Sequence, residues 1–476
     1  MQVQRSAFLQ GAKPLLQELV AQLSKKYGYT SVLAADTRSK AYRVGNTGVN
    51  VLEDELFTRR GFVLKVYDGR SYGEYSFTHI DENAIPAIEA EVDKRLMPLA
   101  RRLPGGLTLS EYDQIPDEPA VLLKSSEYDV HPDEKGDEAI LSDLMAIRND
   151  AKARDERIID CIVSFEYQQI HKLFLSPNRD LEQNLLWSNG FLEVMCPKED
   201  DIVSYYDSAS DLGGAEVLDV LKGKLANAVK CALELMDSES MVPGEYECVC
   251  TPAVTGMIVH EAFGHGVEMD MFVKDRAQAK RFIGQYVASL LITMHDGAAV
   301  QRNTGSFFFD DEGVLAHDTV IIEKGILKRG ISDAQSAMHL GTEPTGNGRR
   351  ESFARKAYTR MTNTYFEPGE DAFADMIASV KDGFLLDNPT GGMEDPKNWG
   401  IQCMVNVARE IKDGKLTGRI FSPIVLTGYV PDLLKSITMV SRDFDLEGAG
   451  MCGKGWKEWV KVSDGGPCIK ARIRLG

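Results

Sequence analysis

The feature that most constrains the fold is a change of residue pattern close to Gly244. Up to that point, apolar stripes with helical spacing alternate with short β-prone runs, whereas the rest of the chain consists mainly of β-prone runs separated by glycine-containing turns. Two of these turns, Glu323-Lys324-Gly325 and Lys412-Asp413-Gly414, lie between apolar flanks and indicate β-hairpins. The C-terminal half is therefore predicted to form one sizeable sheet domain with a helix around residue 260.

The N-terminal third is predicted to contain two helices and several strands. Leucine and valine side chains form one apolar stripe over Pro14–Tyr27, with Pro14 suited to the first turn and Gly28 to the stop. β-prone runs broken by Gly and Asp follow over residues 31–77. A second helix is expected from Glu82 to about Leu103.

The middle of the chain combines an irregular stretch with periodic segments. Residues 104–137 are rich in Pro, Asp, Glu and Gly, which predicts a linker or an irregular crossover. Helices are expected over Asp137–Arg154 and about Gly214–Met236, and strands at 158–167 and 171–175.

The length of 476 residues and these patterns predict three units. They are an N-terminal α/β subdomain over residues 1–110, a middle α/β subdomain with a connecting helix over 111–240, and a β-rich catalytic domain over 241–476.

The formal net charge is −18, from 54 Lys and Arg residues against 72 Asp and Glu residues. An acidic surface repels phosphate backbones, and the two basic clusters, Arg349-Arg350 and Lys470–Arg474, are too small to outweigh it. Nucleic acid is therefore not expected as a partner.

The sequence also carries no sign of secretion or of a membrane span. Met1–Val20 has no uninterrupted apolar core of a signal peptide, and no apolar run approaches about 20 residues. The eight cysteines form no CxxC pair and no dense framework, which favours reduced thiols. A cytoplasmic protein without a membrane partner is expected.

The segment Val254–Asp270 contains His260-Glu261-x-x-x-His265, one residue longer than the zinc-binding His-Glu-x-x-His pattern. On a regular α-helix, residues five apart lie roughly 140° from each other, so two imidazoles at this spacing do not easily share a metal ion. Either a π-type turn or a helix end near Gly264 would bring them together. Glycines on both sides of His265 make either distortion cheaper; the alternative is an ordinary helix with two unrelated histidines.

If the two imidazoles converge, the pattern predicts hydrolytic chemistry. Neutral nitrogens of His260 and His265 would bind zinc. Glu261, next to the first histidine, is placed to accept a proton from the attacking water and to return it to the leaving amine.

A catalytic zinc needs a third protein ligand. Glu268 and Asp270 are interpreted as carboxylates that orient a histidine rather than as ligands. Cys452 is a further candidate because four glycines surround it in Glu447–Gly455, and such a loop approaches a site closely. The residues alone favour a buried loop thiol at this position, with ligation as the alternative.

Four segments in the same order resemble signatures of the TldD/PmbA family, and of its TldD-type members in particular. These segments are Val259–Glu268, Gly341–Ser352, Arg360–Tyr365 and Gly450–Lys454. The resemblance covers roughly residues 210–470 well and the N-terminal third only in pattern.

This resemblance implies a zinc peptidase in which His260, His265 and Cys452 hold Zn²⁺ and Glu261 is the base. It also implies an α+β fold, with N-terminal α/β subdomains followed by a β-rich C-terminal domain that has large mixed sheets and a metal-binding helix. Family members act on short or unfolded peptides in a site enclosed by dimer formation. The chain is expected to form a homodimer, or a heterodimer with a TldE/PmbA-like chain that lacks the metal motif.

Two stretches near the expected cleft depart from the family pattern. They are Gly266–Phe272, after the second histidine, and the tryptophans Trp456 and Trp459, after Cys452. These differences bear on substrate preference rather than on the metal.

Four residues of the other signatures are predicted to contact the substrate: Asn347, Arg349, Arg350 and Asn363. The arginines would capture a peptide carboxylate through bidentate hydrogen bonds, and Asn363 would bond to a peptide backbone. The alternatives are surface arginines on a tight glycine-rich loop and a polar residue at a strand end.

Two other functions compete with the peptidase. A non-catalytic regulator, in line with the family's older label of modulator of DNA gyrase, would make the histidines structural. A zinc amidohydrolase acting on small molecules would differ from a peptidase in the size of its cleft. The presence of Glu261 favours hydrolysis over regulation.

Overall fold

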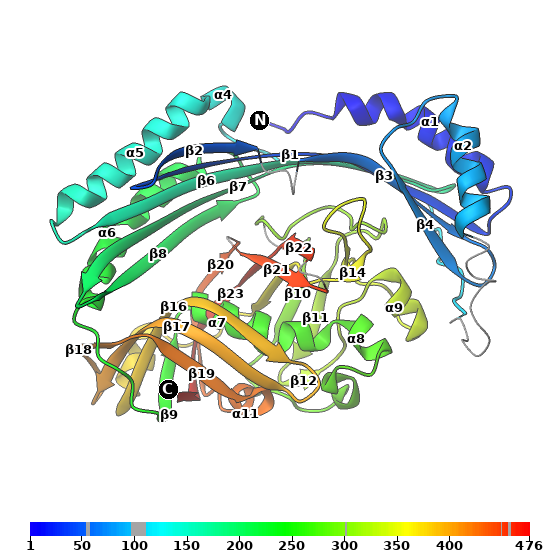
Figure 1. Ribbon diagram of the computed structural model, residues 1–476. Coiled ribbons are helices and arrows are strands. Elements are labelled where there is room, and N and C mark those ends of the chain that lie inside the picture. Colours follow the sequence, from blue (N-terminus) through cyan, green and yellow to red (C-terminus); the bar gives the residue numbers. More distant parts are fainter. Residues whose placement is uncertain (54–57, 97–110, 300–301, 449, 456–457) are drawn as a thin grey trace.

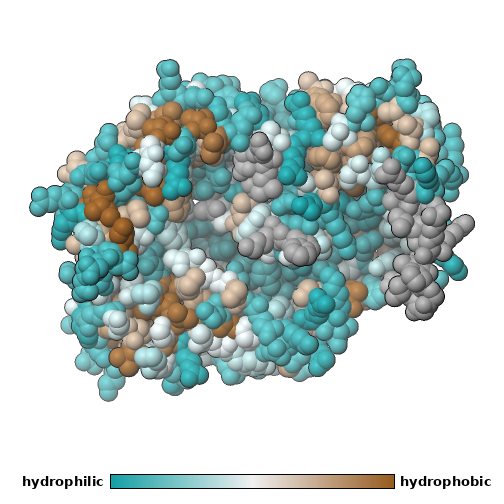
Figure 2. Space-filling view, viewed as in Figure 1, coloured by the Kyte–Doolittle hydropathy of each residue, from teal (hydrophilic) through white to brown (hydrophobic). Residues whose placement is uncertain are grey.

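Two large sheets organise the molecule, and one arches over the other. The computed structural model describes the whole chain apart from residues 54–57, 97–110, 300–301, 449 and 456–457. In Figure 1 the N-terminal sheet forms an arch across the top, and the C-terminal half forms a compact body beneath it. The space-filling view in Figure 2 shows hydrophilic residues over most of the same side, with apolar residues in separate patches.

The arch is a sheet whose described strands run in the order β4-β3-β1-β6-β7-β5, with β2 paired to β1 and β8 paired to β7. Strands from both predicted N-terminal units share it, and the division of the chain into units stays a prediction. The strands are β1 Tyr29–Gly45, β2 Gly48–Glu53, β3 Arg59–Tyr67, β4 Tyr72–Phe77, β5 Ala120–Ser125, β6 Asp160–Leu175, β7 Arg179–Lys198 and β8 Asp201–Asp211.

Helices cover the outer face of the arch (Figure 1). Helix α1 packs its buried leucines on β1, β3 and β6, while α5 and α6 pack on the other half of the sheet. The helices of this half are α1 Ala7–Leu23, α2 Ala84–Glu91, the π-turn η1 Val92–Leu96, α4 Pro132–Lys135, α5 Asp137–Arg154 and α6 Val217–Leu235. The predicted helices over 137–154 and about 214–236 are thereby confirmed. The expected continuation of the second helix to Leu103 lies outside the described residues.

The first helix differs from the prediction at both ends. It begins at Ala7, because the Ser6 hydroxyl accepts a hydrogen bond from the Leu9 amide and caps the first turn. Pro14 is therefore inside the helix and not in its first turn. The helix also ends before Gly28, where the Ser24 hydroxyl bonds to the Val20 carbonyl.

The predicted linker over residues 104–137 contains a strand. In β5, Ala120–Ser125 pairs in parallel with β7. The strand lies at the end of the sheet's path, and Val121 and Leu123 remain 87% and 54% exposed. A short half-exposed strand between Pro- and Asp-rich flanks leaves little periodic signal, which explains why the pattern indicated a linker.

The body contains a mixed sheet in the order β12-β11-β10-β15-β23-β19-β17-β16-β9. Pairs β15–β23 and β16–β9 are parallel and the others are antiparallel, so the predicted α+β fold with large mixed sheets is confirmed. The strands are β9 Gly244–Cys250, β10 Met294–Gly297, β11 Asp318–Glu323, β12 Ile326–Leu327, β15 Asn363–Phe366, β16 Asp382–Asp395, β17 Gly400–Lys412, β18 Lys415–Phe421, β19 Ile424–Tyr429, β20 Met439–Glu447 and β23 Ser463–Leu475.

Both predicted hairpins of the body are present. Lys324 and Gly325 connect β11 to β12, and Asp413 and Gly414 connect β17 to β18. All four residues have positive φ, as two-residue turns of this type require. Strand β23 also pairs with β9, so the path β9-β16-β17-β19-β23 closes on itself. This closed layer packs its apolar side chains around the helix at residues 252–264.

Short elements complete the body around these strands. The helices are α8 Met269–Val273, η4 Gln278–Phe282, α9 Ala334–His339, α10 Phe373–Ala378 and α11 Val430–Lys435, and two small hairpins pair β13 Gly348–Arg349 with β14 Tyr358–Thr359 and β21 Met451–Lys454 with β22 Glu458–Lys461. None of the helices in the described part of the chain is long and apolar enough to cross a membrane.

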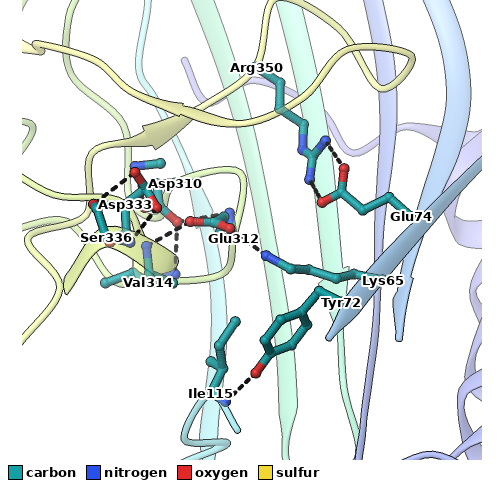
Figure 3. A network of polar contacts seen from close by, with 12 residues as sticks. Lys65, Tyr72, Glu74, Ile115, Asp310, Glu312, Val314, Asp333, Ser336 and Arg350 are labelled. Atoms are coloured by element: carbon teal, nitrogen blue, oxygen red, sulfur yellow. Dashed lines mark hydrogen bonds and ion pairs between the residues drawn. The ribbon is translucent and has the colours of Figure 1, made fainter. Parts of the chain in front are cut away.

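Buried ion pairs join the arch to the body. Figure 3 shows Lys65 of β3 bonded to Glu312, at 2.6 Å, and Arg350 holding Glu74 of β4 through two hydrogen bonds. Lys65 and Glu312 are almost fully buried, so loss of either would leave an uncompensated charge. The arch is thereby held at a defined position over the loops of the body.

His295 connects the strands β10, β11 and β15 near the edge of the body sheet through its side-chain contacts. His295 of β10 bonds through Nδ1 to Asp318 of β11 and through Nε2 to Glu367, each at 2.9 Å, and its ring stacks on Tyr365. Burial alone would lower the pKa of His295, but the two carboxylates raise it above the usual value. Because the folded-state pKa is raised, the stabilisation is complete below the unfolded pKa of about 6.5 and is lost as pH rises through the folded pKa.

The His295→Gln substitution should therefore lower the free energy of unfolding in a pH-dependent way. We expect a loss of about 1 kcal/mol near pH 5.5 and a smaller loss near pH 8.5, since the partly exposed carboxylates reduce the value of the pair. Denaturant unfolding at both pH values measures the loss. His339→Gln, at an exposed position, is the matched control and should leave the unfolding curves unchanged. An equal loss at both pH values would contradict the proposed charge pair.

Candidate metal centre

The helix that carries the histidine motif changes its hydrogen-bonding pattern within the motif. An α-helical turn, α7 Pro252–Met257, continues as the π-turn η2 Ile258–Gly264 and then as the 3₁₀ turn η3 His265–Val267. The His265 amide donates to the His260 carbonyl, five residues earlier. This bond brings the two rings to a centroid separation of 5.1 Å. Both predicted rearrangements, the π-type turn and the end of the regular helix at Gly264, occur together.

The two glycines of the motif are needed for space. Gly264 has φ −60° and ψ −51°, which any residue adopts in a helix. A Cβ at Gly264 would lie 2.2 Å from Met361 Sδ, and a Cβ at Gly266 would lie 2.4 Å from an oxygen of Glu394. The expectation that these glycines ease the backbone distortion is therefore wrong for Gly264: its role is to let the side chain of Met361 approach the helix.

The hairpin β21–β22 places Cys452 against the two histidines. Cys452 lies opposite Val460 in this hairpin, and its Sγ is 3.4 Å from His265 Nε2. One donor atom from each of His260, His265 and Cys452 lies within 4.8 Å of the other two. His260 and Cys452 are each 4% exposed, so the cluster is buried.

These three donors fit a tetrahedral zinc ion. Zinc–nitrogen bonds of about 2.0–2.1 Å and zinc–sulfur bonds of about 2.3 Å give donor separations of roughly 3.3–3.7 Å at tetrahedral angles. The distance of 3.4 Å between Cys452 Sγ and His265 Nε2 falls in this range. Two imidazoles and one thiolate leave the fourth position open, as in catalytic zinc sites.

Cys452 differs electrostatically from the other cysteines of the chain. Burial alone would raise the pKa of its thiol, but the imidazoles of His265 and His260 hold that pKa well below the usual value. Burial raises the pKa of every other cysteine, at positions 161, 196, 231, 248, 250, 403 and 468. Cys452 is thus the thiol best prepared to act as a thiolate.

Glu268 connects the second histidine to the cysteine hairpin. It is 1% exposed, lies 3.4 Å from His265 Nδ1 and accepts a hydrogen bond from Lys454 Nζ at 2.8 Å. Burial would raise the pKa of Glu268, but Lys454 and His265 hold it at about 2. The predicted position of Glu268 beside a histidine is confirmed, and its part in orienting that histidine stays a prediction. Asp270 instead bonds to Lys454, at 2.7 Å, so its predicted contact with a histidine is wrong.

The first histidine has a carboxylate neighbour that the sequence did not indicate. Asp464 of β23 places Oδ2 at 3.9 Å from His260 Nδ1. That nitrogen is buried and has no hydrogen-bond partner among the described residues. Burial raises the pKa of Asp464 to about 6. Asp464 comes from a different strand far along the chain, and no local pattern links it to the motif.

Arg360 holds the cysteine hairpin from the other side. Its guanidinium is 1% exposed and donates to the carbonyls of Cys452, at 2.5 Å, and Glu458, at 2.8 Å. These two carbonyls belong to the two strands of the hairpin, so one side chain fixes both. The sequence places Arg360 at the start of the third family-like segment but gives no indication of this contact.

Glu261 lies beside the first histidine in the π-turn. Burial raises the pKa of its carboxyl above the usual value, whereas the two imidazoles oppose this shift. A carboxylate with a raised pKa is a better proton acceptor at neutral pH than an exposed one. The role of Glu261 as the base stays a prediction.

The residues predicted to contact substrate have different surroundings. Asn347 and Asn363 are 1% and 0% exposed, and their side-chain amides bond to Asp296 and to the Gly297 carbonyl within the protein. Arg350 is held by Glu74. Arg349 is half-buried. Contact of these residues with a substrate stays a prediction.

Only one of the two tryptophans near the expected cleft lies in the described part of the chain. Trp459 lies in β22, where its amide donates to a Glu351 oxygen at 3.0 Å. Trp456 lies outside the described residues.

Comparison with known proteins relates the body of the molecule to metallopeptidases. Residues 243–472 match the PmbA/TldA metallopeptidase C-terminal domain. A metalloprotease of Methanocaldococcus jannaschii is 28% identical over 365 residues, which are 76% of this chain and 78% of that protein. A TldD homolog metalloprotease of Buchnera aphidicola is 37% identical over 247 residues, about half of each chain (51% and 50%). A zinc metalloprotease TldD homolog of Saccharolobus solfataricus is 27% identical over 72% of this chain and 77% of its own.

Two solved structures share the fold over almost the whole chain. One, from Thermotoga maritima, is described as a candidate modulator of a DNA gyrase; it matches 98% of this chain and 100% of its own with a TM-score of 0.75 and 18% identity. TldE from Thermococcus kodakarensis matches 97% and 100%, with a TM-score of 0.73 and 18% identity. At this identity the likeness concerns the fold alone.

The packing around the π-turn predicts opposite effects for two Gly→Ala substitutions. Gly264→Ala should lower the free energy of unfolding by about 1–3 kcal/mol, because the new methyl group displaces the buried Met361. Gly223→Ala, in helix α6 with nothing near its Cβ position, should raise it by about 0.4–1 kcal/mol. Denaturant unfolding of both variants measures the difference. A stabilising effect of Gly264→Ala would show that the packing around the motif is looser than described.

Proposed function

The chain belongs to the TldD/PmbA family, and from this premise we propose that it is a zinc-dependent peptidase of the TldD type. His260, His265 and Cys452 would hold the zinc ion, and Glu261 would act as the base. The observation that carries this proposal is the convergence of the three donor atoms within 4.8 Å next to Glu261. The zinc metalloprotease name of the Saccharolobus solfataricus relative supports the choice of metal.

The residues around the donors have defined parts in the proposed reaction. Zinc, when bound, would supply a Lewis acid that polarises the scissile carbonyl and lowers the pKa of water. Glu261 takes a proton from the attacking water and passes it to the leaving amine. Glu268 orients the His265 imidazole, Asp464 provides a negative charge 3.9 Å from the His260 imidazole, and Arg360 holds the hairpin that presents Cys452.

The proposed substrates are short or unfolded peptides. The donor cluster is buried, and the arch lies over the body that contains it (Figure 1), so an extended chain has easier access than a folded domain. We propose that the active form is a homodimer or a heterodimer with a TldE/PmbA-like chain. The likeness of the fold to TldE is consistent with pairing between related chains.

The Glu261→Gln substitution tests the catalytic part of this proposal. Hydrolysis of an unfolded peptide should fall by at least about 100-fold, because loss of general base catalysis typically costs 10²–10⁴-fold. Zinc content and the unfolding curve should remain those of the wild type. Peptide cleavage is measured by mass spectrometry, with and without a TldE/PmbA-like partner.

Glu343→Gln is the matched control, since Glu343 is exposed and does not belong to the metal cluster. This variant should cleave peptide at the wild-type rate. Stoichiometric zinc in the wild type without peptide cleavage under either condition would contradict the peptidase proposal. A biological effect that persists in Glu261→Gln would favour the non-catalytic regulator instead.

A further inference from the structure

A polar cavity lies between the arch and the body, beside the hairpin β21–β22. Its volume is about 100 Å³, and its walls come from β1, β6, residues 349–353 and β22. Trp459, Val460 and Lys461 of β22 line it, and Val460 lies opposite Cys452 in the hairpin. The cavity therefore adjoins the hairpin that carries Cys452.

The described lining of this cavity is basic, although the chain carries 72 acidic and 54 basic residues. Five of its residues are basic and two are acidic: Arg59, Lys172, Arg349, Arg350 and Lys461 against Asp311 and Glu351. Three of the basic residues have carboxylate partners, because Lys172 pairs with Asp311, Arg350 with Glu74 and Lys461 with Glu166.

Arg349 has no such partner. Among the described residues, no carboxylate forms an ion pair with it; its Nη1 donates to the Met361 carbonyl at 2.7 Å, and its guanidinium lies 5.3 Å from the centre of the Phe307 ring. It also lines a second, adjoining cavity together with Lys172 and Lys461. Burial lowers the pKa of Arg349 to about 10, so the side chain remains a cation at neutral pH. The charges of Asp311 and Asp296 favour this cation, but neither carboxylate forms an ion pair with it, so a ligand that supplies such a pair would stabilise it further.

Two further hydrogen-bond donors in the lining are unsatisfied. Gln168 is 5% exposed, and its Nε2 is buried without a hydrogen-bond partner in the described part of the structure. The same holds for Nε of Arg350, whose other nitrogens bond to Glu74 and to the Arg355 carbonyl. Buried donors of this kind are normally paired. The unpaired groups in this wall are therefore all donors, which is the complement of an anion.

We propose that this cavity binds a carboxylate group, with the Arg349 guanidinium as its ionic partner and Gln168 as a neutral donor. A guanidinium forms two parallel hydrogen bonds with a carboxylate. Leu33, Ala35 and Ile170 supply an apolar wall beside these donors. The cavity thus fits a carboxylate attached to a small apolar group, as at the C-terminus of a peptide. The identification of a peptide as the source rests on the proposed function, whereas carboxylate binding does not.

Isothermal titration of the full-length, zinc-loaded chain tests this site. The chain carries Glu261→Gln so that no peptide is consumed, and the probes are N-acetyl-dialanine with a free carboxylate, the same peptide as its amide, and inorganic phosphate. We expect the acid to bind and the amide to bind at least about 10-fold more weakly, the typical effect of a charge-assisted hydrogen bond. Arg349→Met should weaken binding of the acid by a similar factor.

Three variants control this measurement. Arg276→Met, at an exposed position in the body, should bind the acid like the parent chain. Gln168→Leu, on β6, should weaken binding of the acid by about 3- to 10-fold; a carboxylate held by the metal cluster would not respond to this change. Arg349→Lys keeps the positive charge but lacks the planar guanidinium that forms two parallel hydrogen bonds. It replaces Arg349→Met in the measurement if that variant fails to fold.

Equal binding of the acid to the parent chain and to Arg349→Met would overturn the proposal, as would equal binding of acid and amide. Binding of phosphate but not of the acid would overturn the carboxylate assignment in favour of a phosphate site. A failure of the proposed function would be seen in a different experiment, because peptide cleavage by the wild-type chain tests it. Loss of carboxylate binding and loss of cleavage can therefore be told apart.

Discussion

The proposed metal centre depends on a ring of contacts that connects one helix to one hairpin. Cys452 meets His265, His265 meets Glu268, and Glu268 bonds to Lys454, two residues beyond the cysteine. The negative charge of Glu268 serves both the imidazole and the lysine, so the helix and the hairpin are held by the same buried carboxylate. Arg360 closes the arrangement through the Cys452 carbonyl. Removal of Glu268 would take away the carboxylate neighbour of His265, whereas Lys454 would keep its pair with Asp270.

The larger architecture supports this ring from two directions. The closed layer of body strands packs around the α7–η2 helix and contributes Asp464, the neighbour of His260. The arch is fixed over the body by buried pairs such as Lys65–Glu312 and Arg350–Glu74 (Figure 3). In the cavity between arch and body, Arg349 forms no ion pair with a carboxylate of the described residues and bonds to the Met361 carbonyl.

The sequence predicted the parts of this structure that depend on local patterns. The spacing of five between His260 and His265 required a π-type turn or a helix end, because a regular helix separates such residues by roughly 140°, and both occur. The Asp413-Gly414 turn and helix α5 also follow from local signals. Contacts between segments that are distant in the sequence could not be predicted. Asp464 and Arg360 reach the site through strand pairing and burial, and neither produces a recognisable residue pattern around these positions. The residues around Cys452 favour a buried loop thiol, and only the family resemblance indicates a metal ligand.

The most direct test of the account is X-ray absorption at the zinc edge of the full-length chain. The account predicts close to one zinc ion per chain, with nitrogen neighbours at about 2.0–2.1 Å and one sulfur neighbour at about 2.3 Å. The sulfur contribution should disappear in Cys452→Ser. A fully occupied zinc site whose neighbours are only nitrogen and oxygen would contradict the assignment of Cys452, and with it the convergence on which the proposed chemistry depends.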